Sequence, residues 1–189
     1  MRYRMTTVQV AVAAAIALAG ASTAIADGKT DRSFSAKLIG YNETPLTLNS
    51  PGSGTFEATL SKDGSSLNYT LTFSGLTSNA LQAHVHFGAP AITGQIILFL
   101  CTNLGNAPAG SAGAQPCPAG GGTVTGTLTA ADVIARPTQN IHAGADGFAE
   151  ILAAMSVGAA YANVHSVNFP SGEIRGAVNQ SSDEGDVND

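Results

Sequence analysis

The strongest constraint on the fold is a segment in which apolar and polar side chains alternate with period two. In residues 81–87 the odd-numbered positions are apolar, whereas the even-numbered positions carry Gln82, His84 and His86. Successive side chains of a β-strand point to opposite faces, so this pattern predicts a strand with one apolar and one polar face. The two histidines therefore share the polar face.

Two later segments, residues 161–165 and 173–178, show the same alternation. Their polar side chains are Tyr161, Asn163, His165, Glu173 and Arg175. If all three strands are neighbours in a sheet, their polar faces form one patch of imidazole, amide, carboxylate and guanidinium groups. This patch is the candidate binding site.

Short alternating segments recur along most of the chain and are joined by glycine-rich turns, a pattern typical of an all-β domain. Residues 96–100 are apolar without alternation, which predicts a strand buried on both faces. Residues 146–158 depart from the pattern because their apolar residues have helical spacing. We expect one short helix here, capped by Asp146 and ended by Gly158, that covers an open end of the domain.

The two ends of the chain are unlike the middle. Residues 1–26 combine a basic start, an apolar run and a small-residue cleavage site, and they predict a secretory signal peptide that is cleaved after Ala26. A membrane anchor is the weaker alternative, because the run is shorter than the roughly 20 apolar residues of a spanning helix. Residues 27–33 are an expected linker, residues 34–178 the domain, and residues 179–189 an acidic, disordered tail.

The charge distribution argues against one class of partner. The formal net charge is −5, and the sequence shows no clustered lysines and arginines of the kind that bind nucleic acid. We therefore expect no nucleic-acid partner. After cleavage of the signal peptide we also expect no membrane span.

Cys101 and Cys117 are the two cysteines of the chain. An even count in an exported domain predicts a disulfide, which would close an irregular loop rich in glycine, alanine and proline. A redox or thiolate-metal role is the alternative. The absence of a C-x-x-C motif and of a histidine nearby in sequence argues against it.

The histidines have two interpretations. His84 and His86, with His165 from a neighbouring strand, can bind copper or zinc, and His142 can supply a fourth ligand from an expected loop. In the other interpretation the three strand histidines are neutral members of a polar layer. They would then pair with Asn163, Glu173 and backbone carbonyls, or form a surface for a metal-free ligand or partner.

Glu173 and Arg175 are two residues apart on one strand face. An intramolecular salt bridge that fixes the strand register is the favoured interpretation. The alternative is that Arg175 presents its guanidinium to a carboxylate-bearing ligand. No nucleophile elbow, phosphate loop or metalloprotease motif is present, and no pair of carboxylates stands out for acid–base work. We therefore expect a protein that is not an enzyme.

Several of these segments also have a family resemblance. The stretches Glu43-Thr-Pro45, Ala83-His-Val-His86 with Gly88, Tyr161-Ala-Asn-Val-His165 and Pro170-Ser-Gly-Glu-Ile-Arg-Gly176 resemble the CHRD domain, first described in chordin. The resemblance runs from residue 34 to residue 178. It implies a secreted, all-β, immunoglobulin-like domain, and we expect a Greek-key β-sandwich or barrel with one short covering helix.

Two functional hypotheses follow. In the first, the chain is a non-enzymatic module of the envelope or extracellular space that binds a protein or polymer there, as the role of chordin in binding growth factors suggests. In the second, it is a periplasmic copper- or zinc-binding protein that uses His84, His86 and His165. Both place the mature protein in the periplasm or outside the cell.

Overall fold

A computed structural model describes residues 32–181 of the chain. The expected signal peptide, most of the linker and most of the acidic tail lie outside the described residues. Strand β1 begins at Ser33 and strand β8 ends at Gln180, so the folded domain is slightly longer at both ends than expected. No helix in residues 32–181 has the length and apolar character needed to cross a membrane.

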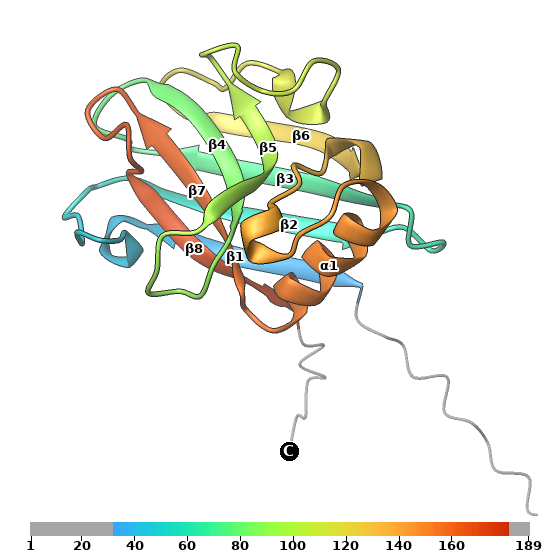
Figure 1. The fold of residues 1–189 in the computed structure, drawn as a ribbon. Helices are drawn as coiled ribbons and strands as arrows, with labels where there is room; N and C mark the ends of the chain where they lie inside the picture. Colours follow the sequence, from blue (N-terminus) through green and yellow to red (C-terminus); the bar gives the residue numbers. More distant parts are fainter. Residues whose placement is uncertain (1–31, 182–189) are drawn as a thin grey trace, which may run out of the picture. The chain divides into compact units, whose positions relative to one another are not determined.

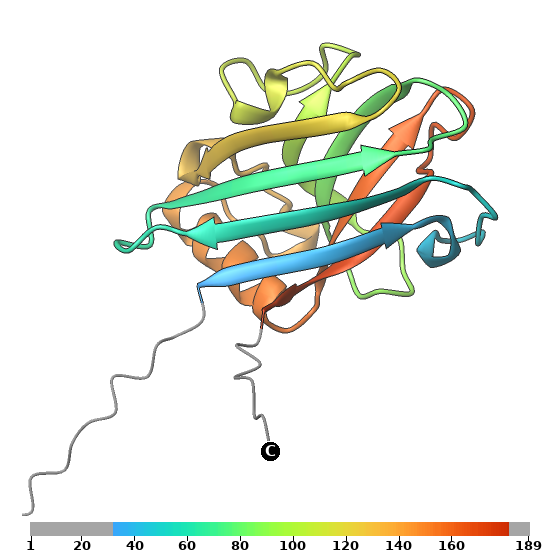
Figure 2. The same cartoon turned by 180° about the vertical axis from the view of Figure 1, so that it is seen from behind.

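Eight antiparallel strands form a single sheet within the described part of the chain. They are β1 (Ser33–Ile39), β2 (Ser53–Leu60), β3 (Ser66–Ser74), β4 (Ala80–Phe87), β5 (Gln95–Thr102), β6 (Gly122–Thr129), β7 (Ala160–Ser166) and β8 (Ile174–Gln180). Their order in the sheet is β5-β4-β7-β8-β1-β2-β3-β6. The sheet curls into a nearly closed barrel (Figures 1 and 2), which confirms the expected all-β class.

The alternation in the sequence builds the core of the barrel. On β3, Leu67, Tyr69, Leu71 and Phe73 are buried, whereas most of the residues between them are exposed. Inward-facing side chains of the other strands join the same apolar cluster. On β5, residues 97–102 are all buried, as the uninterrupted apolar run predicts.

Helix α1 (Gly144–Ser156) is the expected short helix, and its apolar face packs on the core. The helix covers one end of the barrel (Figure 1). Its N-cap is three positions earlier than predicted: Ala143 is the N-cap, and Asp146 lies in the first turn. Asp146 still suits that position, because a carboxylate near a helix N-terminus interacts favourably with the helix dipole.

Four short 3₁₀ helices connect the strands in residues 32–181. They are η1 (Gly40–Asn42), η2 (Ala112–Ala114), η3 (Ala130–Asp132) and η4 (Pro137–Gln139). Thr129 caps η3 by accepting from the backbone N–H of Ala131, and Asp132 completes the capping box.

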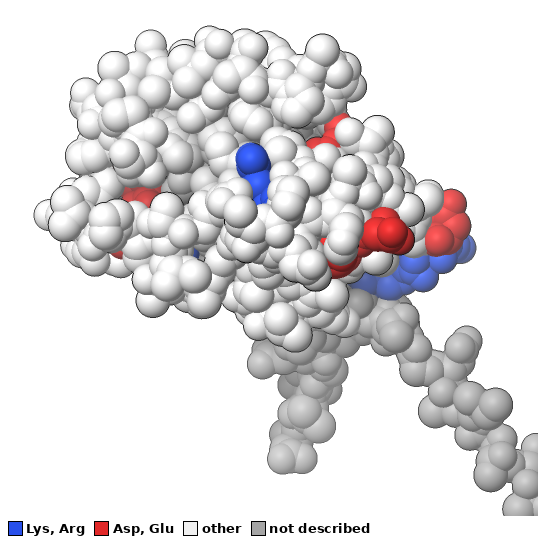
Figure 3. Space-filling view, in the orientation of Figure 1, with Lys and Arg blue, Asp and Glu red and all other residues white. Residues whose placement is uncertain are grey.

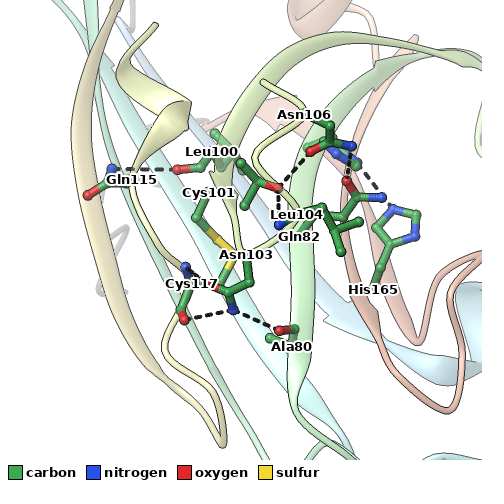
Figure 4. Close-up of a disulfide and its surroundings, with 12 residues drawn as sticks. Ala80, Gln82, Leu100, Cys101, Asn103, Leu104, Asn106, Gln115, Cys117 and His165 are labelled. Carbon is green, nitrogen blue, oxygen red and sulfur yellow. Dashed lines mark hydrogen bonds between the residues drawn. A yellow bond between two sulfur atoms is a disulfide. The ribbon is translucent and has the colours of Figure 1, made fainter. Parts of the chain in front are cut away.

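Side chains bridge the seam between the two edge strands, β5 and β6. The hydroxyl of Tyr69 donates to the carbonyl of Leu100 on β5 at 2.6 Å. The amide of Gln115 donates to the carbonyl of Thr125 on β6 at 2.9 Å, and Figure 4 shows it beside Leu100. In a fully closed barrel these carbonyls would accept from the neighbouring strand, and here side chains donate to them instead.

The predicted disulfide between Cys101 and Cys117 is confirmed (Figure 4). Next to it, the side chain of Asn103 donates to the carbonyls of Ala80 and Cys117 and accepts from the backbone N–H of Cys117. The bridge and Asn103 together attach the start and end of the irregular loop to the same edge of the barrel.

Candidate metal centre

Strands β4, β7 and β8 lie side by side in the sheet, so the three segments with polar faces are neighbours as expected. The register pairs Gln82 with His165, His84 with Asn163, and Asn163 with Arg175. The residues between these polar positions, such as Val85 and Val164, belong to the barrel core, so the polar side chains occupy the opposite face of the sheet.

That polar face is not open to solvent. His84 is 0% exposed, and His86, Asn163 and His165 are each below 8%. The loops at residues 40–52, 88–94 and 167–173 fold over the face and bond to its side chains. The sequence predicts a polar patch, and the structure shows a polar layer buried between the sheet and these loops.

His84, His86 and His165 converge in this layer. One ligand atom from each imidazole lies within 4.8 Å of those of the other two, and no other such group of His, Cys, Asp or Glu side chains occurs within residues 32–181. Nδ1 of His84 is 3.2 Å from Nε2 of His165. Two nitrogens bound to one tetrahedral zinc at about 2.0–2.1 Å are roughly 3.3 Å apart, so the observed separation suits a shared ion.

Backbone carbonyls orient two of the three rings. Nδ1 of His165 is 3.0 Å from the carbonyl oxygen of Pro170, and Nδ1 of His86 is 3.1 Å from that of Gly94. A carbonyl only accepts, so both Nδ1 atoms must carry the proton. The Nε2 atoms of His86 and His165 therefore carry the lone pairs available to a metal ion, and a carbonyl that fixes the tautomer in this way is typical of a metal-binding histidine.

The tautomer of His84 follows from that of His165. Because Nε2 of His165 can only accept, Nδ1 of His84 donates to it in the metal-free protein. Nε2 of His84 and Nε2 of His86 are then both buried acceptors without a hydrogen-bond partner. Each such atom costs about 1–3 kcal/mol of folding free energy.

Burial keeps the three imidazoles neutral. It lowers the pKa of His84 from 6.5 to about 2, with the nearby His165 and His86 lowering it further. Burial also lowers the pKa of His86 to about 4, against the opposing effect of its bond to Gly94. The pKa of His165 is lowered for the same reason. Neutral imidazole is the form that binds a metal ion.

Aromatic rings enclose the cluster on two sides. The ring of Phe99 meets that of His84 edge to face, with centroids 4.5 Å apart. The ring of Tyr161 stacks on that of His86, with the two ring centroids 4.7 Å apart. The guanidinium carbon of Arg175 lies over the phenol ring of Tyr161, 3.4 Å from its centroid. The stack of Arg175, Tyr161 and His86 limits the movement of the His86 ring.

Arg175 connects the sheet to two covering loops. Its guanidinium donates to the hydroxyl of Thr44 and to the carbonyls of Ala89 and Ile92, the latter at 2.6 Å. Glu173 has other partners, because its carboxylate accepts from the hydroxyl of Ser50 and the backbone N–H of Thr77. The expected Glu173–Arg175 salt bridge is therefore replaced by two separate sets of loop contacts.

Two residues are placed differently from the sequence-based view. His142, the suggested fourth ligand, lies apart from the cluster and pairs with Glu150 at 2.6 Å on the surface. Glu43, which was not among the candidate site residues, is buried against Asn163, whose amide donates to it at 2.7 Å. The Glu43-Thr-Pro45 stretch was part of the family resemblance, and that was the signal available for this position.

The disulfide loop contributes to the cover over the cluster. Asn106 in this loop donates to the side chain of Gln82 at 2.8 Å, and Figure 4 shows this pair beside His165. Gly113 packs so closely on Phe99 that an added Cβ would lie 2.2 Å from the Phe99 carbonyl oxygen. The loop therefore supports the ring that packs against His84.

Comparison with known families decides the relationship that the motifs suggested. The family model of the CHRD domain matches residues 34–178. The chain belongs to the CHRD family. Comparison with the curated proteins and with the solved structures finds no match. All three histidines and the layer that holds them lie within the matched CHRD region.

Proposed function

We propose that this CHRD domain is an exported, non-enzymatic metal-binding protein that holds copper or zinc at His84, His86 and His165. The observation that carries the proposal is the convergence of three buried, neutral imidazoles, two of which have an Nε2 atom without a hydrogen-bond partner. A metal ion shared by His84 Nδ1, His86 Nε2 and His165 Nε2 would use the lone pair of His86 Nε2, which a purely structural polar layer would leave unsatisfied.

The ligand set favours a late first-row transition metal. Imidazole nitrogens suit zinc and copper, and the cluster contains no carboxylate of the kind that calcium or magnesium requires. For divalent ions at a nitrogen site, affinity rises to a maximum at copper, so we expect Cu²⁺ to bind more tightly than Zn²⁺. Three protein ligands leave a fourth position for water or an exogenous group.

The geometry gives less support to a partner-binding surface at the same residues. Tyr161 and Arg175, on which such a surface would depend, are each 2% exposed. Charged side chains are also few on the face shown in Figure 3. An extracellular or envelope partner would have to contact other residues of the domain.

The proposed location rests on two observations. The confirmed disulfide favours an oxidising compartment. The sequence of residues 1–26 has the features of a signal peptide. We propose that the mature protein works in the periplasm or outside the cell.

The test is a titration of the mature, metal-free protein with Cu²⁺ and with Zn²⁺. Calorimetry measures the affinity and stoichiometry, and NMR monitors the imidazole signals. We expect one ion per chain and shifts confined to His84, His86 and His165. Electron paramagnetic resonance of the Cu²⁺ form should show nitrogen ligands. If stoichiometric metal leaves all three imidazoles unshifted, the proposal is wrong.

Substitution of single ligands supplies the matched control. His86→Gln and His165→Gln should each lower affinity at least tenfold, because each removes one of three ligands. His142→Gln, which changes an exposed histidine outside the cluster, should leave affinity unchanged. Equal loss in all three variants would point to non-specific surface binding.

A further inference from the structure

A second concave site lies outside the histidine cluster. It is a cavity of about 260 Å³ between the loop that follows β1 and the loop that joins β7 to β8. Its apolar wall is formed by Pro45, Leu46, Leu48, Phe169 and Pro170. Pockets for drug-sized ligands have volumes of roughly 300–1,000 Å³, so this cavity suits a smaller molecule.

One acidic side chain, that of Glu43, also lines the cavity beside this apolar wall. It is 5% exposed, and the amide of Asn163 donates to its Oε1 atom at 2.7 Å. The backbone of Gly172 packs against both carboxyl oxygens, since an added Cβ would lie 2.8–2.9 Å from each. The carboxyl is therefore held in place by the fold.

The nearest cationic side chain does not neutralise this carboxyl by direct contact. The guanidinium of Arg175 donates to Thr44, Ala89 and Ile92 and stacks on Tyr161. Burial raises the pKa of Glu43 to about 7, although Asn163 and Arg175 act in the opposite direction. An ionised carboxylate in such a site is poorly solvated and would be stabilised by a cation that enters the cavity.

We propose that this cavity binds a small organic ammonium ion, whose –NH₃⁺ group donates to Glu43 and whose short apolar chain lies against Leu48 and Phe169. An ammonium group forms a charge-assisted hydrogen bond with a carboxylate, and the hydrocarbon part gains from burial against the apolar wall. A carboxylate ligand would be repelled by the same charge. A hydrated metal ion would leave the apolar wall unused.

The test uses n-butylammonium as the probe at pH 8, with the backbone amide signals of Thr44, Phe169 and Gly172 followed by NMR. n-Butanol and butyrate are controls for the apolar chain alone and for the opposite charge. We expect saturable shifts with butylammonium and at least tenfold weaker binding of both controls. Failure of butylammonium to shift these signals, or equal binding of butanol, would overturn the proposal.

Two variants identify the group responsible. Glu43→Gln keeps the size of the side chain and its acceptor for Asn163, and it should lower butylammonium affinity at least tenfold. Glu57→Gln removes an exposed carboxyl on β2 and should leave affinity unchanged. If Glu43→Gln retains full affinity, the proposal is wrong. His86→Gln, which changes a metal ligand whose backbone partner Gly94 does not line the cavity, should still bind butylammonium, and this separates the cavity from the metal centre.

Discussion

Nδ1 of His84 lies 3.2 Å from Nε2 of His165, although 81 positions separate the two residues in the chain. The pairing of β4 with β7 brings them together, and Pro170 fixes the tautomer of His165. The metal-free protein thus holds one proton between two nitrogens that a metal ion can share.

The first prediction concerns the carbonyl that orients His86. An added Cβ on Gly94 would lie 2.0 Å from the carbonyl oxygen of Phe87, so Gly94→Ala must move the backbone that accepts from His86 Nδ1. Loss of such a partner lowers metal affinity by about 10–100-fold. We expect a change of that size in Cu²⁺ affinity, measured by calorimetry.

Gly120→Ala is the matched control, because nothing lies within 4 Å of an added Cβ there. It should leave Cu²⁺ affinity unchanged. If Gly94→Ala also binds Cu²⁺ with wild-type affinity, the carbonyl of Gly94 has no role in holding the metal ligand.

The second prediction concerns the guanidinium that connects the loops to the sheet. Arg175→Lys keeps the charge, but a lysine cannot bond to three separate acceptors and stack on Tyr161 at the same time. Loss of hydrogen bonds from a charged group and of a cation–π contact should lower the free energy of unfolding by roughly 3 kcal/mol. Urea denaturation of the metal-free protein measures this.

The reverse exchange at an exposed site, Lys37→Arg on β1, provides the control. Surface substitutions of this kind change stability by about 0.5 kcal/mol or less. A similarly small effect of Arg175→Lys would show that the loop contacts contribute little.

The alternation of side chains was enough to predict much of the fold. It placed Gln82, His84 and His86 on one face of a strand and Asn163 and His165 on one face of another. The side-chain period in a strand is two, so a correct strand assignment fixes these faces regardless of which strands pair. The apolar run on β5 was likewise enough to predict burial on both faces.

The sequence alone could not show that the polar face is buried. Its cover comes from loops without periodic pattern, and their path depends on long-range contacts such as Arg175 with Ala89. For the same reason the burial of Glu43 was missed, since it lies in a loop and meets Asn163 only in the folded chain. His142 was suggested as a ligand because its loop position left its location open.

The third prediction concerns the disulfide. Cys101→Ala/Cys117→Ala releases the cross-link that closes the loop at residues 102–116, and the chain-entropy estimate for a loop of that size is a loss of roughly 3 kcal/mol. The side chain of Asn103 still donates to the backbone carbonyls of Ala80 and of position 117, because the substitutions leave the backbone unchanged. We therefore expect a folded but less stable domain.

Hydrogen exchange followed by mass spectrometry checks where the loss of stability appears. Exchange should increase most in residues 102–116 and near Phe99, which the loop covers, and least in β1 and β2. Uniform acceleration through the whole domain would indicate that the disulfide stabilises the barrel as a unit and has no local effect on the cover.

The last prediction is a pH dependence that arises from Glu43. Its pKa is raised by burial from 4.5 to about 7 in the folded protein, while Asn163, Arg175 and Glu173 modulate it. The folded state therefore holds a proton that the unfolded state releases between these pH values. The stability from this group is fully present below pH 4.5 and is lost as the pH rises through about 7.

Glu43→Gln removes this titration, so the variant and the wild type should differ in their pH profiles. Each pKa unit corresponds to about 1.4 kcal/mol, so the wild type should lose roughly 2–3 kcal/mol relative to the variant between pH 5 and pH 8. Urea denaturation of both metal-free proteins at several pH values measures the difference, and Glu57→Gln controls for the loss of one exposed carboxyl. Parallel stability curves for the wild type and Glu43→Gln would show that Glu43 titrates near its ordinary pKa, and that the cavity does not hold a buried, unneutralised carboxyl.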